Sequence, residues 1–102
     1  MSTYRLGPKG FSDLAEIFDY TVDTWGEEQA ENYLDEFARV FHRLADSPGL
    51  GRAGDRIYPG IRRFEQGKYV IFYFYKPERH GIVISRIVHQ RRLPTRLYFI
   101  DA

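Results

Sequence analysis

The chain has 102 residues, a formal net charge of +1 and an apolar fraction of 43%. This length fits one domain, which we place over residues 1–102, and the apolar content argues against a disordered chain. Cysteine is absent, which excludes disulfides and thiolate metal sites and fits a reducing compartment. The N-terminus lacks the apolar run of a signal peptide, and the longest apolar stretch, residues 69–75, is too short to span a bilayer. We therefore expect a cytoplasmic protein without membrane contact.

The charges are segregated along the chain. Residues 11–38 carry nine carboxylates and no Lys or Arg, whereas the remainder carries all fifteen basic residues and five acidic ones. Such segregation predicts an acidic region and a basic region on the folded chain. These regions are either two ordinary solvated faces, or the basic one meets an acidic partner or a phosphate backbone.

The first half of the chain predicts a short strand followed by two helices. Residues 3–6 alternate weakly and suit a strand. From Pro8 to Trp25, apolar residues recur at spacings of three and four, which indicates an amphipathic helix closed by Gly26. A second such helix starts with acidic residues at Glu27 and is stopped by Pro48. The short turn between the helices predicts an antiparallel hairpin.

The second half predicts a β-meander. After a loop over residues 47–60, the apolar period changes to two over residues 61–66, 68–76 and 82–88. In the central strand we expect the face with Val70, Phe72 and Phe74 to cover the helices, and the face with Tyr73 to be half exposed. The fold class is therefore α+β, with an N-terminal short strand and an antiparallel helical hairpin packed on a mainly antiparallel sheet of three to four strands.

The C-terminal tail, about residues 93–102, is unusual because Pro94 interrupts it and four large apolar residues follow. It is either a closing segment docked on the core or a segment held out for a partner.

Several local motifs resemble those of ParE-type toxins in the RelE/ParE toxin–antitoxin superfamily. They are Trp25-Gly26-Glu27-Glu28-Gln29-Ala30, Leu44-Ala45-Asp46-Ser47-Pro48, Leu50-Gly51-Arg52, Pro59-Gly60-Ile61-Arg62, Tyr69-Val70-Ile71-Phe72-Tyr73 and Arg86-Ile87-Val88-His89-Gln90-Arg91-Arg92. Each motif is weak alone, but their order and spacing are specific. The resemblance implies the RelE/ParE fold and the toxin half of a type II system, neutralised by a ParD-like antitoxin. It also implies growth arrest through DNA gyrase and a role in plasmid stabilisation.

The superfamily also contains ribosome-dependent mRNA endonucleases, which require an acid, a base and cations at the phosphate. His89 resembles a histidine of some nuclease members, but Gln90 follows where those members tend to have an aromatic hydroxyl, and residues 57–64 lack their lysine cluster. Strand alternation also places Arg86 and His89 on opposite sides, unless the strand ends or bulges between them. We predict a noncatalytic inhibitor without catalytic residues. An mRNA endonuclease and a non-toxic, interaction-only relative are the alternatives.

The predicted binding residues form two sets. Acidic groups of the antitoxin are expected to meet basic residues of the sheet, and the antitoxin set is Arg62, Arg63, Tyr73 and Arg86. The target set combines charge with amphipathic anchors and is Arg91, Arg92, Leu97, Tyr98 and Phe99. The antitoxin is expected to fold along the hairpin and sheet, in a heterodimer or heterotetramer. We expect no cofactor, no metal site and no sequence-specific nucleic-acid binding by this chain.

Overall fold

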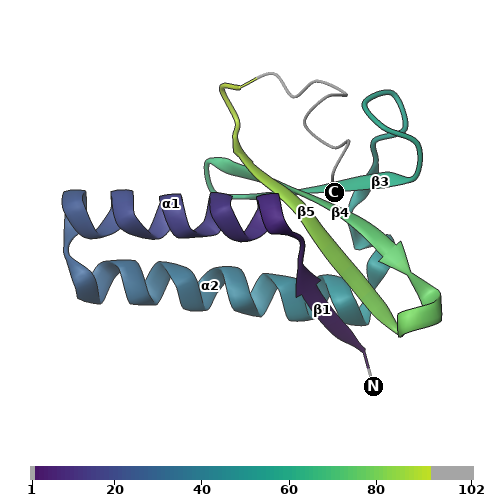
Figure 1. Cartoon of the computed structure of the whole chain (residues 1–102), viewed down its shortest axis with the longest axis horizontal. Helices are drawn as coiled ribbons and strands as arrows, with labels where there is room; N and C mark the ends of the chain where they lie inside the picture. The colour runs from purple at the N-terminus through teal and green to yellow at the C-terminus, as the bar shows by residue number, and fades with distance from the viewer. Residues whose placement is uncertain (1, 93–102) are drawn as a thin grey trace.

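A computed structural model describes residues 2–92 and places two helices against a mixed sheet (Figure 1). The elements are β1 (Thr3–Leu6), α1 (Pro8–Trp25), α2 (Glu27–Asp46), β2 (Arg52–Ala53), β3 (Ile61–Gln66), β4 (Tyr69–Lys76) and β5 (Gly81–His89), with single 3-10 turns at Pro48–Leu50 and Pro77–Arg79. The sheet order is β1-β5-β4-β3-β2. Only β1 runs parallel to its neighbour, β5, and the other pairs are antiparallel.

The α+β class, the hairpin and the meander are confirmed, but the sheet has five strands rather than three to four. The additional strand is β2, which pairs its two residues with Arg62 and Arg63 of β3. It lies within the stretch that we expected to be loop. Two residues are too few to show the alternation of apolar and polar side chains that predicts a strand. Only the pairing with β3 makes these residues part of the sheet.

The hairpin forms where the sequence places it. Pro8 occupies the first turn of α1, where its missing N–H would have no helical partner. Gly26 joins the helices with φ of 94° and ψ of 167°, a conformation that is essentially restricted to glycine. Glu27 and Glu28 fill the first turn of α2, where carboxylates interact favourably with the helix dipole. Figure 1 shows that the hairpin turn lies far from the sheet.

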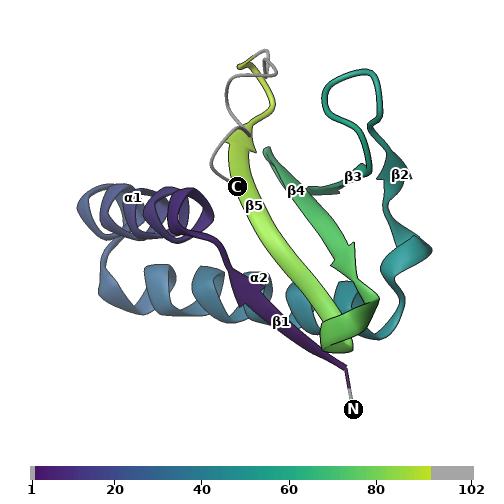
Figure 2. The same ribbon diagram turned by 45° about the vertical axis from the view of Figure 1, so that its right-hand side comes forward.

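The main core lies between the hairpin and one face of the sheet, and it reverses our prediction for β4. Ile71 and Tyr73 point into this core with Phe37, Phe41 and Leu44 of α2. Val70 and Phe72 belong to a second cluster on the other face. We call this other face, formed by Ile61, Val70, Phe72 and Val88, the open face; Figure 2 shows the sheet with the helices beside it.

Tyr73 can be buried because both hydrogen-bonding functions of its hydroxyl are satisfied. The side chain is fully buried, and its hydroxyl donates to the Pro48 carbonyl at 2.7 Å and accepts from the Gly51 N–H at 2.9 Å. A buried phenol with partners carries no desolvation penalty that would force it to the surface. The prediction that Tyr73 is half exposed is therefore wrong. The sequence around Tyr73 does not indicate its burial, because the hydrogen-bond partners belong to a loop more than twenty residues away.

We expect Tyr73→Phe to lower the free energy of unfolding by about 1.5 kcal/mol, because two backbone groups lose their partner. Tyr75→Phe, in the same strand and half exposed, is the matched control and should leave stability unchanged. Urea unfolding of both variants measures the difference. Equal midpoints would show that the Tyr73 hydroxyl does not stabilise the fold.

Candidate partner-binding site

A groove of about 870 Å³ opens between the hairpin and the end of the sheet. Its walls come from α1, the start of α2, the β3–β4 turn and the end of β5. We call it the hairpin groove. The lining residues that carry the argument below are Glu16, Tyr20, Trp25, Tyr33, Lys68, Tyr69, His89, Arg91 and Arg92. The Tyr20 and Trp25 side chains are 63% and 70% exposed. Two large aromatic side chains open to solvent beside one groove are typical of a surface that binds a partner.

The first turns of α1 fix the position of the groove by packing directly on β5. Pairing of β1 with β5 ends at Leu6 and Ile84, and the Gly7 N–H then donates to the Ile84 carbonyl at 2.9 Å. At Gly10 the helix approaches so closely that a Cβ atom would lie 2.5 Å from the Ile84 carbonyl oxygen. Only glycine allows this distance without moving the helix from the strand.

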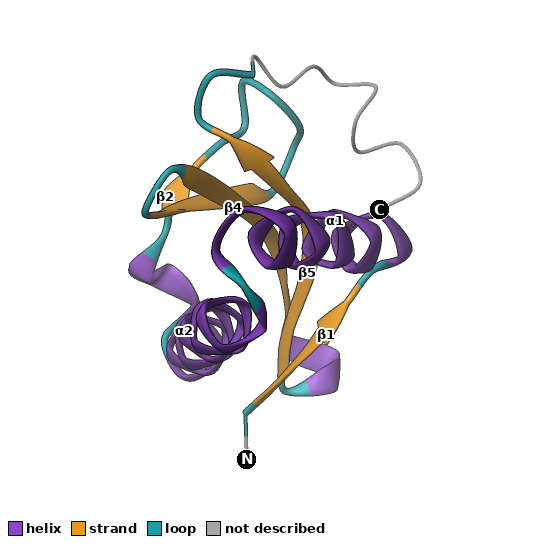
Figure 3. Cartoon of the chain, turned by 90° about the vertical axis from the view of Figure 1, so that its left-hand side faces the viewer, coloured by secondary structure: helices purple, strands orange, loops and turns teal. Residues whose placement is uncertain are grey.

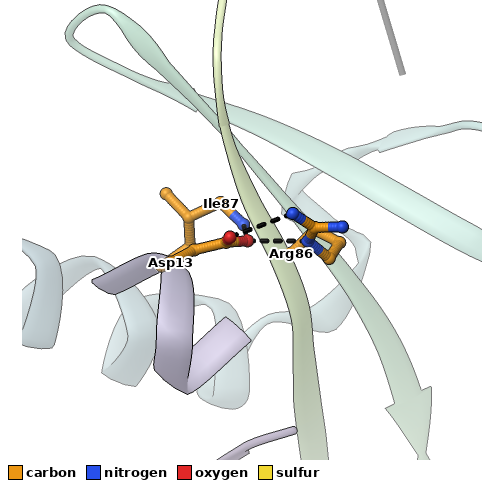
Figure 4. A network of polar contacts seen from close by, with 3 residues as sticks. All are labelled: Asp13, Arg86 and Ile87. Atoms are coloured by element: carbon orange, nitrogen blue, oxygen red, sulfur yellow. Dashed lines mark hydrogen bonds and ion pairs between the residues drawn. The ribbon is translucent and has the colours of Figure 1, made fainter. Parts of the chain in front are cut away.

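Asp13 continues this attachment one turn further along α1 (Figure 4). Its carboxylate accepts from Arg86 Nε at 2.7 Å, from Arg86 Nη2 at 3.0 Å and from the Ile87 backbone N–H at 2.9 Å. Both side chains of the pair are largely buried, with 12% of Asp13 and 16% of Arg86 exposed. The N-terminal half of α1 is thus tied to β5, and its C-terminal half, which carries Tyr20 and Trp25, forms one wall of the groove.

Aromatic rings connect the helical wall of the groove to its strand wall. The rings of Tyr33 and Tyr69 lie 6.4 Å apart, and those of Tyr69 and His89 lie 5.4 Å apart in an edge-to-face arrangement. Burial raises the pKa of Tyr33, and the neighbouring Tyr69 and Glu36 raise it further. Burial and Tyr20 raise the pKa of Tyr69, and Arg92 opposes that shift. Both phenols therefore stay protonated at neutral pH and can hydrogen-bond to a partner.

The two rims of the groove differ in charge. Glu16 lies on the α1 side, whereas Lys68, Arg91 and Arg92 lie on the side formed by the β3–β4 turn and the residues after β5. His89 sits at this basic rim, where its Nδ1 accepts from the Arg91 backbone N–H at 3.2 Å. The groove thus offers aromatic surface in the middle and positive charge along one side, which suits a segment with apolar anchors and acidic residues.

The four residues predicted to meet the antitoxin do not share one surface. Tyr73 is fully buried, so the prediction of an exposed contact there is wrong. Arg62 donates from Nε and Nη2 to the Gly51 carbonyl and also reaches the Gly49 carbonyl, which holds the loop after α2. Arg86 was predicted to meet an acidic residue of the antitoxin, but in the structure its guanidinium pairs with Asp13 of the same chain.

Arg63 remains a candidate contact for the antitoxin. Its side chain is 31% exposed, and its guanidinium carbon lies 5.8 Å from the centre of the Phe72 ring on the open face. Of the predicted target set, Arg91 and Arg92 are exposed and line the hairpin groove. Leu97, Tyr98 and Phe99 lie outside the described residues.

Sequence reasoning missed the aromatic wall of α1. We assigned Trp25 to the apolar stripe that faces the core, and Tyr20 was not singled out. A usable signal was present: Tyr20 is a large aromatic residue outside the stripe, among the acidic positions of the helix. Exposed aromatic side chains on a charged helix face favour partner binding over core packing.

The register of β4 and β5 decides whether Arg86 and His89 lie on the same face of the sheet, as a shared nuclease site would require. A bulge shifts the pairing so that Phe72 faces Arg86 while Tyr73 faces Ile84. Beyond the bulge the alternation is regular, which puts Arg86 on the open face and His89, opposite Tyr69, on the helix face. The expected separation of Arg86 from His89 is confirmed.

Between residues 2 and 92, no three His, Cys, Asp or Glu side chains gather as metal ligands would. Neither described helix is long and apolar enough to cross a membrane.

The fold is that of the toxins of RelE/ParE type. The structure superimposes on a chain of the chromosomal ParDE toxin–antitoxin system from P. aeruginosa with a TM-score of 0.70, at 23% identity, covering 87% of this chain and 96% of that one. It matches the RelBE2 toxin–antitoxin complex from Mycobacterium tuberculosis with a TM-score of 0.65, at 21% identity, covering 86% of this chain and 96% of the other. At these low identities, the structural similarity establishes the fold alone.

Sequence comparison defines the family. Residues 4–94 match the family described as the ParE toxin of the type II toxin–antitoxin system, parDE. Toxin ParE1 of Mycobacterium tuberculosis is 42% identical over 90 residues, and Toxin ParE1 of Caulobacter vibrioides is 34% identical over 92 residues. Each alignment covers 88% of this chain and 91% of the relative. The chain belongs to the ParE family and is a toxin of the type II toxin–antitoxin class.

Proposed function

We propose that this toxin acts by binding and not by catalysis, and that its target is DNA gyrase. The observation that carries the proposal is the hairpin groove, with solvent-exposed aromatic residues on one wall and Arg91 and Arg92 at its rim. Arg91 and Arg92, together with Leu97, Tyr98 and Phe99, are the proposed contacts to the target. The separation of Arg86 from His89 supports a mechanism without a reaction centre, since an RNA-cleaving site must bring its acid, base and cations to one phosphate.

The proposed antitoxin is ParD-like, and its C-terminal segment occupies the hairpin groove. Apolar side chains of that segment pack against Tyr20 and Trp25, and its carboxylates meet Lys68, Arg91 and Arg92 along the basic rim. An antitoxin bound in this way covers the same arginines that the target needs. The antitoxin would then neutralise the toxin by blocking access to Arg91 and Arg92, because two large partners cannot contact the same side chains at once.

Trp25→Ala tests the place of the antitoxin. We expect binding of the co-purified antitoxin to weaken about 30-fold, because a buried aromatic anchor at the centre of an interface contributes about 2 kcal/mol. Phe11→Ala is the matched control, since Phe11 is an exposed aromatic residue of the same helix outside the groove. Titration by isothermal calorimetry measures both variants. If both substitutions weaken antitoxin binding equally, or if Trp25→Ala does not weaken it, the antitoxin does not bind in the hairpin groove.

The target is tested by charge reversal at the rim. Arg91→Glu with Arg92→Glu should abolish inhibition of gyrase supercoiling by the purified toxin, because the proposed cationic contacts become repulsive to an acidic or phosphate-bearing surface. Arg56→Glu with Arg79→Glu changes the net charge equally at exposed positions outside the groove and should retain inhibition.

The same preparation distinguishes the alternatives. Intact translated mRNA together with inhibited supercoiling supports the binding mechanism. Cleaved mRNA with unaffected gyrase contradicts it and favours the ribosome-dependent endonuclease. Harmless expression of the toxin without its antitoxin favours an interaction-only relative.

A further inference from the structure

His89 is the last residue of β5, and ring contacts with the core hold its side chain in place. It lies opposite Tyr69 in the pairing of β4 with β5, and the two ring centres are 5.4 Å apart, edge to face. The Tyr69 ring lies 6.1 Å from that of Phe37, which is fully buried in the main core. Figure 3 views α2, which carries Phe37, nearly end-on beside the sheet. A row of aromatic rings thus connects the main core with the rim of the hairpin groove at His89.

The backbone after His89 makes a tight turn in which three successive N–H groups have partners. The Gln90 N–H donates to the Lys68 carbonyl at 2.8 Å, which attaches this turn to the β3–β4 turn. The Arg92 N–H donates to the His89 carbonyl at 2.9 Å and closes the turn. Between them, the Arg91 N–H donates to Nδ1 of His89 at 3.2 Å. Of these three hydrogen bonds, only the one from Arg91 depends on a side chain.

The Nδ1 atom of His89 acts here as the side-chain oxygen of asparagine acts in an Asx turn. In an Asx turn, an Asn or Asp side chain accepts a hydrogen bond from the backbone N–H two residues later. Nδ1 of histidine is attached to Cγ, as Oδ1 of asparagine is, so it can reach the same N–H. A ring nitrogen that accepts a hydrogen bond carries no proton, and the proton of the neutral His89 ring is therefore on Nε2.

This turn carries Arg91 and Arg92, which are exposed and line the hairpin groove. An exposed arginine side chain has many rotamers, but the backbone sets the direction in which they start. Without its hydrogen bond to His89, the Arg91 peptide can rotate and direct the side chain away from the groove. A partner that binds only the held form then loses apparent affinity in proportion to the fraction of toxin molecules that leave this form.

We propose that His89 is a positioning residue of the basic rim. In the tautomer with its proton on Nε2, it holds the turn that directs Arg91 and Arg92 toward an acidic partner in the hairpin groove. This inference rests on the proposed role of the groove in binding the antitoxin. His89 acts through the backbone of Arg91, and this role requires neither a nuclease reaction nor a direct contact between the imidazole ring and the partner.

Two substitutions separate the two ring nitrogens of His89. His89→Asn places an amide oxygen where Nδ1 lies, whereas the longer side chain of His89→Gln places its amide at the position of Nε2. Both remove the ring that packs on Tyr69, so that loss is common to the pair. We expect the Arg91 amide to exchange about fivefold faster in His89→Gln than in His89→Asn, the factor that one hydrogen bond of ordinary net strength provides. Equal exchange rates would overturn the proposal.

The unsubstituted toxin offers a test that does not depend on how the variants fold. Nitrogen NMR of the His89 ring at neutral pH should show the proton on Nε2 and a bare Nδ1. A proton on Nδ1 would contradict the hydrogen bond from Arg91 and overturn the proposal. Neither this measurement nor the amide exchange depends on which partner the toxin binds.

Calorimetric titration with the co-purified antitoxin tests the effect on binding. We expect His89→Gln to bind about fivefold more weakly than His89→Asn, because the same hydrogen bond holds the arginines in place. Equal affinities of the two variants would overturn the proposal. Weaker binding by His89→Asn would also overturn it, since that result indicates a direct contact through Nε2.

Arg91→Glu with Arg92→Glu, titrated in the same way, separates a failure of this inference from a failure of the proposed function. If charge reversal weakens antitoxin binding while the two His89 variants bind equally, only the role of His89 is wrong. If charge reversal also leaves the affinity unchanged, the basic rim does not bind the antitoxin and both proposals are wrong.

Discussion

Replacing Asp13 with asparagine is expected to lower the free energy of unfolding by about 3 kcal/mol, because the substitution removes the negative charge of a largely buried ion pair. The Asp13 carboxylate accepts two hydrogen bonds from Arg86 and one from the Ile87 backbone N–H. The asparagine side chain has nearly the same shape but only one acceptor oxygen and no charge. Urea unfolding monitored by circular dichroism measures the loss.

Glu65→Gln is the control for Asp13→Asn. Glu65 forms an ion pair with Arg52 at 2.5 Å, and its side chain is 60% exposed. Exposed pairs contribute less than about 1 kcal/mol, so this variant should unfold close to the parent. Similar losses in the two variants would show that the burial of the Asp13–Arg86 pair has no particular importance for stability.

Gly10→Ala should also destabilise the fold by about 3 kcal/mol, at the upper end of what overpacking usually costs. The added Cβ would lie 2.5 Å from the Ile84 carbonyl oxygen and 3.3 Å from that of Ser85. Both atoms belong to the backbone of β5, so no side chain can rotate to make room. The helix must move away from the strand, which also separates Asp13 from Arg86.

Gly49→Ala provides the matched control, because a Cβ at Gly49 meets no atom within 4 Å. Alanine at that position should leave the unfolding midpoint nearly unchanged. Thermal and urea unfolding of both alanine variants measure this difference in stability. A Gly10→Ala protein as stable as the parent would mean that α1 can shift on β5 without loss.

The features that could be predicted from the sequence are those with local signals. The helices follow from apolar spacing, and the end of the first helix follows from Gly26, whose φ of 94° disfavours other residues. The strands of the meander follow from alternation. The sheet face that covers the helices could not be predicted, because the hydroxyl of Tyr73 is satisfied by Pro48 and Gly51, which lie far away in sequence.

The candidate site was harder to predict than the fold, because its geometry depends on long-range pairs. Asp13 and Arg86 are separated by 73 positions, and nothing local to either residue indicates their pairing. Arg91 and Arg92 were singled out for their charge, and the structure places them on the hairpin groove. Trp25 was assigned to the core because its spacing fits the apolar stripe. The spacing of apolar residues in a helix shows which residues share a face, but it does not show how much of that face the sheet covers.

The central proposal, that the hairpin groove binds the antitoxin, is tested most directly by amide hydrogen exchange of the toxin with and without its co-expressed antitoxin. We predict that the antitoxin slows exchange in three regions that line the groove: the second half of α1, the β3–β4 turn at Gly67 and Lys68, and Gln90 to Arg92. Slowed exchange confined to β2 and β3, with the second half of α1 unchanged, would contradict the account.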